Sequence, residues 1–150
     1  MFDLDLFRFQ HLLQVTNQGD SRRIFDPIRK KWLLLQPEEL VRQLMLQFLT
    51  TEKGYNKNRV KVEKYLKVNT LSKRCDILVY DAAMMPFLLV ECKAPQVSLN
   101  DAVFLQMASY NLPLRVPFLM MTNGLVAYCC KVDYETASFS ELPEVPSFLP

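Results

Sequence analysis

Two apolar runs joined by a short connector constrain the fold more than any other feature. Residues 74–80 (RCDILVY) and 86–93 (PFLLVECK) each have the length and composition of a buried β-strand. Three ionisable side chains interrupt these runs, namely Asp76, Glu91 and Lys93. Glu91 and Lys93 are two residues apart, so on a strand they point to the same face. If the two strands are antiparallel neighbours, Asp76 lies beside the end of the second strand.

This arrangement predicts two carboxylates and an ammonium at one end of a sheet. A carboxylate buried there without a partner costs several kcal/mol, so a cation is expected to compensate it. Asp76, Glu91 and the backbone carbonyl of Cys92 offer hard oxygen ligands, which suit magnesium, with manganese as the alternative. Lys93 would hold a metal-activated water or stabilise charge on phosphate oxygens. The pattern is typical of a metal-assisted phosphodiesterase.

Length and composition predict one domain. The chain has 150 residues, enough for a single core, and we expect residues 1–27 to form an N-terminal extension and residues 134–150 a C-terminal tail. The net charge of +2 is too small to diagnose nucleic-acid binding. Neither a signal peptide nor an apolar run of about 18 residues is present, so we expect a cytoplasmic protein with no membrane association. Four cysteines without zinc spacing are expected to be buried free thiols: Cys75, Cys92, Cys129 and Cys130.

The remaining periodicity predicts two helices and several more strands. One helix starts at Gln36-Pro37 and ends before Gly54, and a second covers roughly residues 99–110. Two short strands flank a charged turn at residues 29–31. Further strands are predicted at residues 60–68, with a kink or bulge at Lys64, and at 74–80, 86–93, 116–121 and 125–132. This order favours an α/β fold with a mixed central sheet flanked by helices, αβββαβ in its core.

Two acids open the first predicted helix and have different expected roles. Glu38 pairs naturally with Arg42 four residues on. Glu39 faces only Gln43 at that spacing, so it could point at the end of the sheet and join the metal site. A surface acid that complements the helix dipole is the equally favoured alternative.

Taken together, the motifs resemble the PD-(D/E)xK nuclease core, and residues 28–133 resemble the N-terminal nuclease domain of type I restriction enzyme HsdR subunits, in particular its small stand-alone form. Gln106 to Tyr110 fits the Gln-x-x-x-Tyr helix signature of the RecB-like branch. The other matching stretches are Pro37–Gln43, Arg74–Tyr80, Glu91–Pro95 and Thr122–Gly124.

The resemblance implies a magnesium-dependent endonuclease acting on DNA, with Asp76 and Glu91 as metal ligands and Lys93 as the catalytic lysine. It implies that Glu39 reaches the metal directly or through water. The residues expected to support the site or contact the DNA backbone are Lys73, Arg74, Gln106 and Tyr110. Protein partners of a restriction or repair system are further candidates, and a homo-oligomer is left open. The chain contains no Gly-Lys-Ser/Thr phosphate loop, so we expect no ATP-driven translocation by these residues.

Two alternatives compete with the nuclease. One is a catalytically silent module that keeps the nuclease fold and binds nucleic acid or a protein. The other is a plain α/β domain in which Glu91 and Lys93 form a same-face ion pair. Replacing that pair by apolar residues would then be tolerated.

Overall fold

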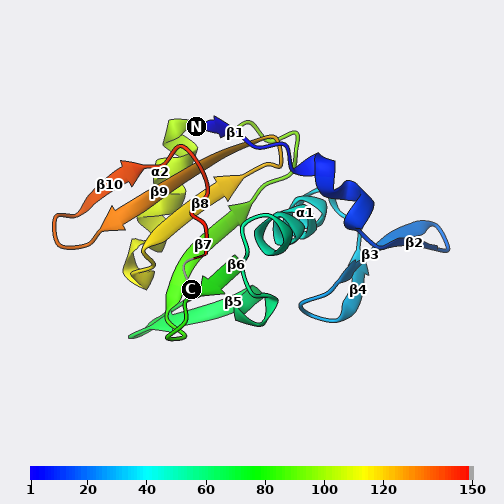
Figure 1. Ribbon diagram of the computed structural model, residues 1–150, viewed down its shortest axis with the longest axis horizontal. Helices are drawn as coiled ribbons and strands as arrows, with labels where there is room; N and C mark the ends of the chain where they lie inside the picture. The colour runs from blue at the N-terminus through cyan, green and yellow to red at the C-terminus, as the bar shows by residue number, and fades with distance from the viewer. Residues whose placement is uncertain (149–150) are drawn as a thin grey trace.

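A computed structural model describes residues 1–148. Its main feature is a seven-stranded mixed sheet with the order β1-β9-β8-β7-β6-β5, to which β10 is added on β9 (Figure 1). The strands are β1 (Phe2–Asp3), β5 (Val60–Val68), β6 (Leu71–Tyr80), β7 (Pro86–Cys92), β8 (Phe118–Thr122), β9 (Val126–Asp133) and β10 (Ser138–Glu141). β7 and β8 are parallel, whereas β6 and β7 are antiparallel. The predicted α/β class and the antiparallel central pair are therefore confirmed.

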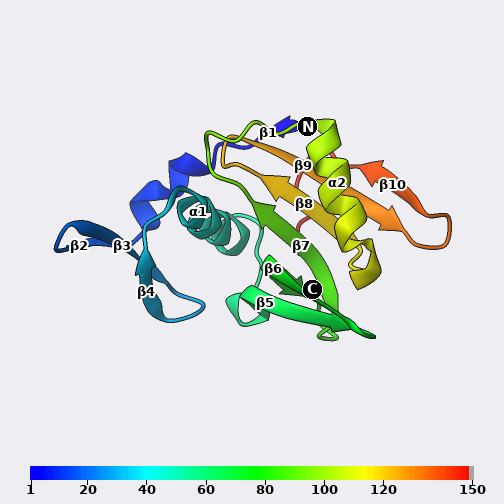
Figure 2. The same ribbon diagram turned by 180° about the vertical axis from the view of Figure 1, so that it is seen from behind.

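Two helices cover opposite faces of this sheet (Figures 1 and 2). α1 (Pro37–Thr51) packs its apolar stripe on one face, in a core that includes Leu44 and Phe48. α2 (Asp101–Asn111) packs Phe104 and Met107 on the other face. Both helices start within two residues of the predicted positions. Within residues 1–148, no helix has the length and apolar character needed to cross a membrane.

A second, three-stranded sheet lies to one side of the main sheet (Figure 1). It consists of β2 (Val15–Gln18), β3 (Ser21–Asp26) and β4 (Lys31–Leu34). The predicted charged turn joins β3 to β4. The Asp26 carboxylate is fully buried and accepts hydrogen bonds from the backbone N–H groups of Ile28 (2.8 Å) and Arg29 (3.0 Å), which fixes this turn.

The N-terminal extension and the C-terminal tail both pack against the domain. Phe2 pairs with Ala127 of β9, and a short 3-10 helix (η1, Leu6–Leu12) follows. In the tail, the sequence did not predict β10, which pairs antiparallel with β9. All four residues of β10 are exposed, so its sequence carries no burial pattern and the backbone ladder alone defines it. Further on, the Tyr55 hydroxyl donates to the Pro146 carbonyl (2.6 Å).

β5 changes direction in its middle. Glu63 has a left-handed backbone conformation (φ +53°), one residue before the predicted kink at Lys64. Before this point, Val60 and Val62 belong to the core under α1, whereas Leu66 beyond it packs with the core under α2. The pairing register with β6 continues unchanged across the kink. The kink therefore turns the outer half of the β5–β6 hairpin toward the α2 side of the sheet.

Candidate active site

Asp76 of β6 is fixed at the end of β7. At this end of β6 and β7, the last backbone pair is Ile77 with Val90. Beyond it, the side chain of Asp76 takes the place of a backbone acceptor. Its Oδ2 accepts a hydrogen bond of 2.8 Å from the backbone N–H of Cys92. The carboxylate thus lies next to the Cys92 backbone, whose carbonyl was predicted as a metal ligand.

Glu91 and Lys93 line one cleft on the α2 side of the sheet, as their spacing predicted. The cleft has a volume of about 370 Å³, and Met121 of β8 and Val103 of α2 contribute apolar wall. Glu91 pairs in register with Met121 on the parallel strand β8. The backbone N–H of Lys93 donates to the Thr122 carbonyl at 2.8 Å. This bond extends the backbone pairing of β7 with β8 to Lys93, the predicted catalytic lysine.

The charge on Glu91 is strongly disfavoured in the protein. Burial raises the pKa of Glu91 to about 8, with further contributions from the charge of Asp76 and a hydrogen bond with it, while Lys93 acts in the opposite direction. Two carboxyl groups therefore share a small space, and a cation bound there would favour the ionised form of both. Neither Glu91 nor Lys93 belongs to an ion pair among residues 1–148, so the predicted alternative of a Glu91–Lys93 salt bridge is not formed.

Gln106 and Tyr110 form the α2 wall of the same cleft. Tyr110 is 62% exposed, and the Lys73 ammonium lies 3.6 Å from the centre of its ring in a cation–π contact. Asn111 also lines the cleft, and within the described residues its buried Oδ1 has no hydrogen-bond partner. Three of the four predicted support residues therefore meet at this cleft.

Arg74 lies apart from the cleft. Its Nε donates to Glu63 Oε2 at 2.9 Å, and its side chain is 58% exposed. It joins β5 to β6 at the kink rather than lining the cleft.

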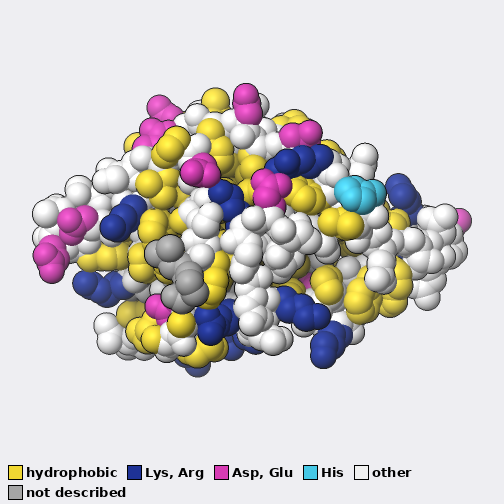
Figure 3. Space-filling view, viewed as in Figure 1, with side chains coloured by type: hydrophobic (Ala, Val, Ile, Leu, Met, Phe, Trp, Pro, Cys, Tyr) yellow, Lys and Arg dark blue, Asp and Glu magenta, His cyan; other side chains and the backbone are white. Residues whose placement is uncertain are grey.

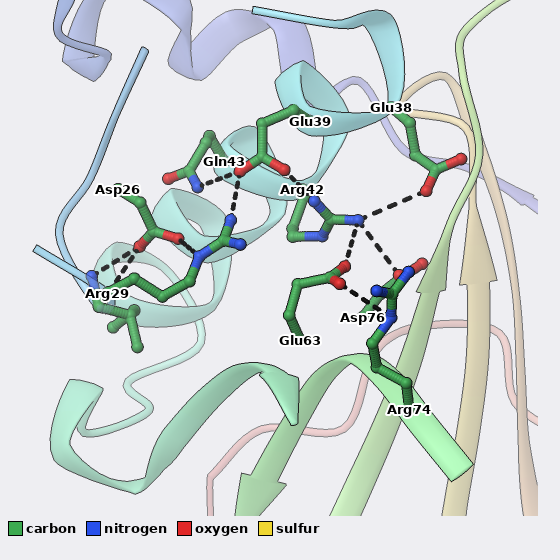
Figure 4. A network of polar contacts seen from close by, with 10 residues as sticks. Asp26, Arg29, Glu38, Glu39, Arg42, Gln43, Glu63, Arg74 and Asp76 are labelled. Carbon is green, nitrogen blue, oxygen red and sulfur yellow. Dashed lines mark hydrogen bonds and ion pairs between the residues drawn. The ribbon is translucent and has the colours of Figure 1, made fainter. Parts of the chain in front are cut away.

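Arg42 of α1 connects several carboxylates at once (Figure 4). Its Nη2 lies 2.8 Å from Glu63 Oε1, 3.2 Å from Asp76 Oδ1 and 3.4 Å from Glu38 Oε1. Its Nη1 donates to Glu39. Burial alone would lower the pKa of Arg42, but Asp76 and Glu63 raise it above its ordinary value. Arg42 thus donates to Oδ1 of Asp76, while the backbone N–H of Cys92 donates to Oδ2.

Glu39 lies in this arginine network rather than at the cleft. Its Oε1 accepts from Arg29 Nη2 (2.6 Å) and from Gln43 Nε2 (3.0 Å), and its Oε2 accepts from Arg42. At the i,i+4 position Glu39 faces Gln43, as predicted, and accepts a hydrogen bond from it, while its ion-pair partners are Arg29 and Arg42. Both oxygens of Glu39 accept hydrogen bonds within this network, so its carboxylate is directed at Arg29, Gln43 and Arg42.

Glu38 is the acid of the first helix that acts on Glu91. It is half exposed, and its negative charge contributes to the raised pKa of Glu91. Sequence reasoning missed Glu38, Arg42 and Glu63 as members of the site. The sequence held no clear signal for Arg42, because it lies off the apolar stripe of the helix and its spacing predicts only an exposed partner of Glu38.

The donor set suits a hard cation that keeps much of its own hydration. Among residues 1–148, no group of three or more His, Cys, Asp or Glu side chains could hold a metal ion. Asp76, Glu91 and the Cys92 carbonyl are the predicted oxygen donors at this end of β7, and of these Glu91 lines the cleft. Magnesium is commonly bound by one or two carboxylates and completes its octahedron with waters and substrate phosphate, so these residues fit it.

Comparison with known proteins adds three findings. The family described as "Type I restriction enzyme R protein N terminus (HSDR_N)" matches residues 37–146. Among solved structures, the chain is similar to the fragment structure of a putative HsdR subunit of a type I restriction enzyme from Vibrio vulnificus YJ016, with a TM-score of 0.52 and 20% identity. That similarity covers 75% of this chain and 24% of the Vibrio chain, and it concerns the fold. No curated protein matches the sequence.

Proposed function

Since the chain belongs to the type I restriction enzyme R protein N-terminus family, we propose that it is a magnesium-dependent nuclease that cleaves DNA phosphodiester bonds at the cleft between β7 and α2. One observation carries the proposal. Burial, and then the neighbouring charge of Asp76, raise the pKa of Glu91 to about 8, although Lys93 acts in the opposite direction. A carboxylate pair of this kind is costly unless a cation is bound there.

Three donors would hold the ion, namely the carboxylates of Asp76 and Glu91 and the backbone carbonyl of Cys92. The ion, when bound, would polarise the phosphorus centre and lower the pKa of a coordinated water. The Cys92 N–H and Arg42 fix the two oxygens of Asp76, so the ligand is oriented before the substrate arrives. This preorganisation belongs to the protein and does not depend on the metal.

Lys93 would act on the substrate side of the cleft. Its ammonium can donate to the attacking water or to a non-bridging phosphate oxygen as negative charge develops. Gln106 and Tyr110 face it across the cleft and would orient the phosphodiester, and Lys73 would add positive charge beside Tyr110. The attacking oxygen forms a bond to phosphorus, and the bond to the leaving oxygen breaks.

The two acids of α1 divide their roles. Glu38, which is half exposed and interacts with Glu91 through its charge, would hold a metal-bound water. Glu39 would act through Arg42, as a positioning residue that keeps the guanidinium directed at Asp76. The first-helix acid near the metal is then Glu38 instead of Glu39.

Plasmid cleavage tests the proposal. Wild-type protein is expected to nick or linearise supercoiled DNA with magnesium or manganese and to be inactive with EDTA. Asp76→Ala, Glu91→Gln and Lys93→Ala should each lose cleavage, because each removes a ligand or the cationic group. Lys131→Gln, at an exposed position on β9, serves as the control and should cut like wild type. Equal cutting by all five proteins would point to a contaminating nuclease, and no cutting by wild type would favour the silent binding module.

A further inference from the structure

Positive charge is concentrated on the β5–β6 hairpin and on the short 3-10 helix before it (η2, Lys57–Arg59). Residues 57–74 contain seven basic residues and one acid, Glu63, although the whole chain has a net charge of only +2. Blue side chains gather along the lower edge of the molecule in Figure 3, where β5 lies in Figure 1, and most acidic side chains lie elsewhere. The basic residues are Lys57, Arg59, Lys61, Lys64, Lys67, Lys73 and Arg74.

Most of this charge is available for binding. Lys61, Lys64 and Lys67 are exposed on β5, and none of them has a carboxylate within ion-pair distance in the part of the chain that the structure describes. The exposed Tyr65, with 60% of its surface accessible, lies between two of these lysines. Unpaired lysines around an exposed aromatic ring suit a polyanion that also offers flat or sugar surfaces.

The register places the charges on a two-stranded ribbon. Tyr65 is opposite Arg74, and Lys67 is opposite Ser72, so these four side chains share one face of the hairpin beyond the kink. The opposite face carries Leu66, which packs with the core under α2, together with Lys64 and Lys73. A two-stranded ribbon of this width can enter the major groove of DNA or follow its backbone.

The ribbon starts at the candidate active site. Glu63, at the kink, binds both Arg42 and Arg74, and Arg42 in turn binds Asp76. Two pairs beyond the kink, Lys73, which is opposite Leu66, lies against the ring of Tyr110 in the cleft wall. The left-handed conformation of Glu63 is a strained one for a non-glycine residue, and strain of this kind is common where a structure positions a functional element. The hairpin therefore continues the cleft outward as a positively charged arm.

We propose that the outer half of the β5–β6 hairpin, residues 64–74, is the arm that binds the phosphate backbone of duplex DNA and guides it to the cleft. The inference rests on the proposed function for the identity of the ligand. Lys67 contributes phosphate contacts on the face that carries Tyr65, which packs against the sugar surface. Lys64 contributes phosphate contacts from the opposite face, on which Lys73 also lies. This assigns nucleic-acid contacts to β5, in addition to Lys73 and Arg74 on β6.

The experiment measures binding without cleavage. Fluorescence anisotropy of a short labelled DNA duplex is recorded in EDTA over a series of salt concentrations, with wild type, the double variant K64Q/K67Q and the matched control K30Q/K31Q. The control removes the same charge from exposed lysines at the β3–β4 turn. We expect K64Q/K67Q to weaken binding about tenfold or more near 0.1 M salt and to reduce the salt slope by about 2, while the control changes little. Poly-glutamate is tested as a competitor and should displace the duplex poorly.

The outcomes separate this inference from the nuclease proposal. Three results would contradict the proposal that the hairpin binds DNA. They are an affinity and salt slope of K64Q/K67Q equal to those of wild type, an equal loss of affinity in K30Q/K31Q, and displacement of DNA by poly-glutamate at matched charge. Any of these results is compatible with metal-dependent plasmid cleavage. If wild type binds DNA through the hairpin but cuts no DNA under any metal condition, the DNA-binding proposal is supported and the nuclease proposal fails. Unchanged melting temperatures would show that K64Q/K67Q is folded, as expected for exposed side chains.

Discussion

At the scale of single residues, Arg42 decides how the acidic end of the sheet is held together. Its side chain is 7% exposed, and it contacts acids from α1, β5 and β6 at once. A buried charge cluster of this kind contributes little net stability when complete but is costly when one partner is removed. The same contacts orient Asp76, so stability and function depend on one guanidinium.

Replacing Arg42 tests this dependence. Arg42→Met keeps much of the side-chain volume but removes a shared cation. Glu39 keeps Arg29 and Glu63 keeps Arg74, whereas Asp76 loses its ion-pair partner among the described residues. We expect a loss of about 3 kcal/mol in the free energy of unfolding, measured in urea. Arg42→Lys keeps the charge without the fork of donors and should fall between wild type and the Met variant. A control at the half-exposed partner, Glu38→Gln, should cost less than about 1 kcal/mol. Equal stability of Arg42→Met and wild type would show that the cluster carries no such penalty.

Glu91 predicts a characteristic pH dependence of the metal-free protein. Its pKa is about 8 in the folded chain against an ordinary value of 4.5, mainly through burial and then through Asp76. Between these values the folded state binds more protons than the unfolded state, so the free energy of unfolding should fall as pH rises through this window. Urea unfolding in EDTA at several pH values measures the slope. Glu91→Gln should flatten it, and an identical slope in the variant would assign the effect to other groups.

At the scale of elements, the β8–β9 connection ties the cleft to the N-terminal segment. Asn123 Oδ1 accepts hydrogen bonds from the backbone N–H groups of Leu125 (3.0 Å) and Val126 (3.1 Å), and its Nδ2 donates to the Val97 carbonyl (2.9 Å) in the loop that leads to α2. Gly124 follows with φ +90° and lies against Phe7 of η1. The turn thus joins three segments that are distant in sequence.

Gly124→Ala should be clearly destabilising. A Cβ there would meet the Phe7 ring at 3.1 Å and would sit in a backbone conformation that disfavours side chains. We expect a loss of about 2–3 kcal/mol in thermal or urea unfolding. Gly19→Ala is the matched control, because it also has a positive φ (+60°) but no atom within 4 Å of the added Cβ. Its cost should stay near 1 kcal/mol, and equal losses would mean that the contact with Phe7 is irrelevant.

At the scale of the whole molecule, a mixed sheet between two helices brings both sides of the cleft together. β6 and β7 supply the carboxylates and Lys93, α1 supplies Arg42 behind Asp76, and α2 supplies the opposite wall. The core on each side of the sheet holds these elements in place. The site therefore depends on the complete domain.

Metal binding should consequently stabilise the whole domain. If magnesium or manganese binds at Asp76 and Glu91, the folded state gains about 2.7 kcal/mol at a metal concentration one hundred times the Kd, and the Tm rises with metal concentration. Asp76→Ala and Glu91→Gln should lose this rise, whereas Lys93→Ala should keep it because the ammonium is no ligand. Differential scanning fluorimetry against a chelator baseline measures the shift. A rise of equal size in Asp76→Ala would place the bound ion elsewhere.

Hydrophobic periodicity and residue chemistry predicted those elements whose sequences carry a local burial pattern. The two helices, the central strands and the antiparallel placement of Asp76 beside the end of β7 were expected from apolar runs, the proline at the start of α1 and the spacing of Glu91 and Lys93. β10 was missed because all of its residues are exposed. The kink of β5 was expected one residue late, because the turn is set by ion pairs of Glu63 with arginines on two other elements.

The sequence by itself determined the mixed α/β architecture and the convergence of two acids and a lysine, because alternation on a strand and antiparallel pairing follow from backbone geometry. Only the tertiary structure decided which side chains each acid of α1 contacts. Glu38 and Glu39 are neighbours in sequence with equal propensities, and the helix rotates them onto different faces. Arg29, from a turn ten residues earlier, binds Glu39 and leaves Glu38 toward Asp76 and Glu91. Such a choice depends on which distant side chains pack nearby, and no local pattern records that.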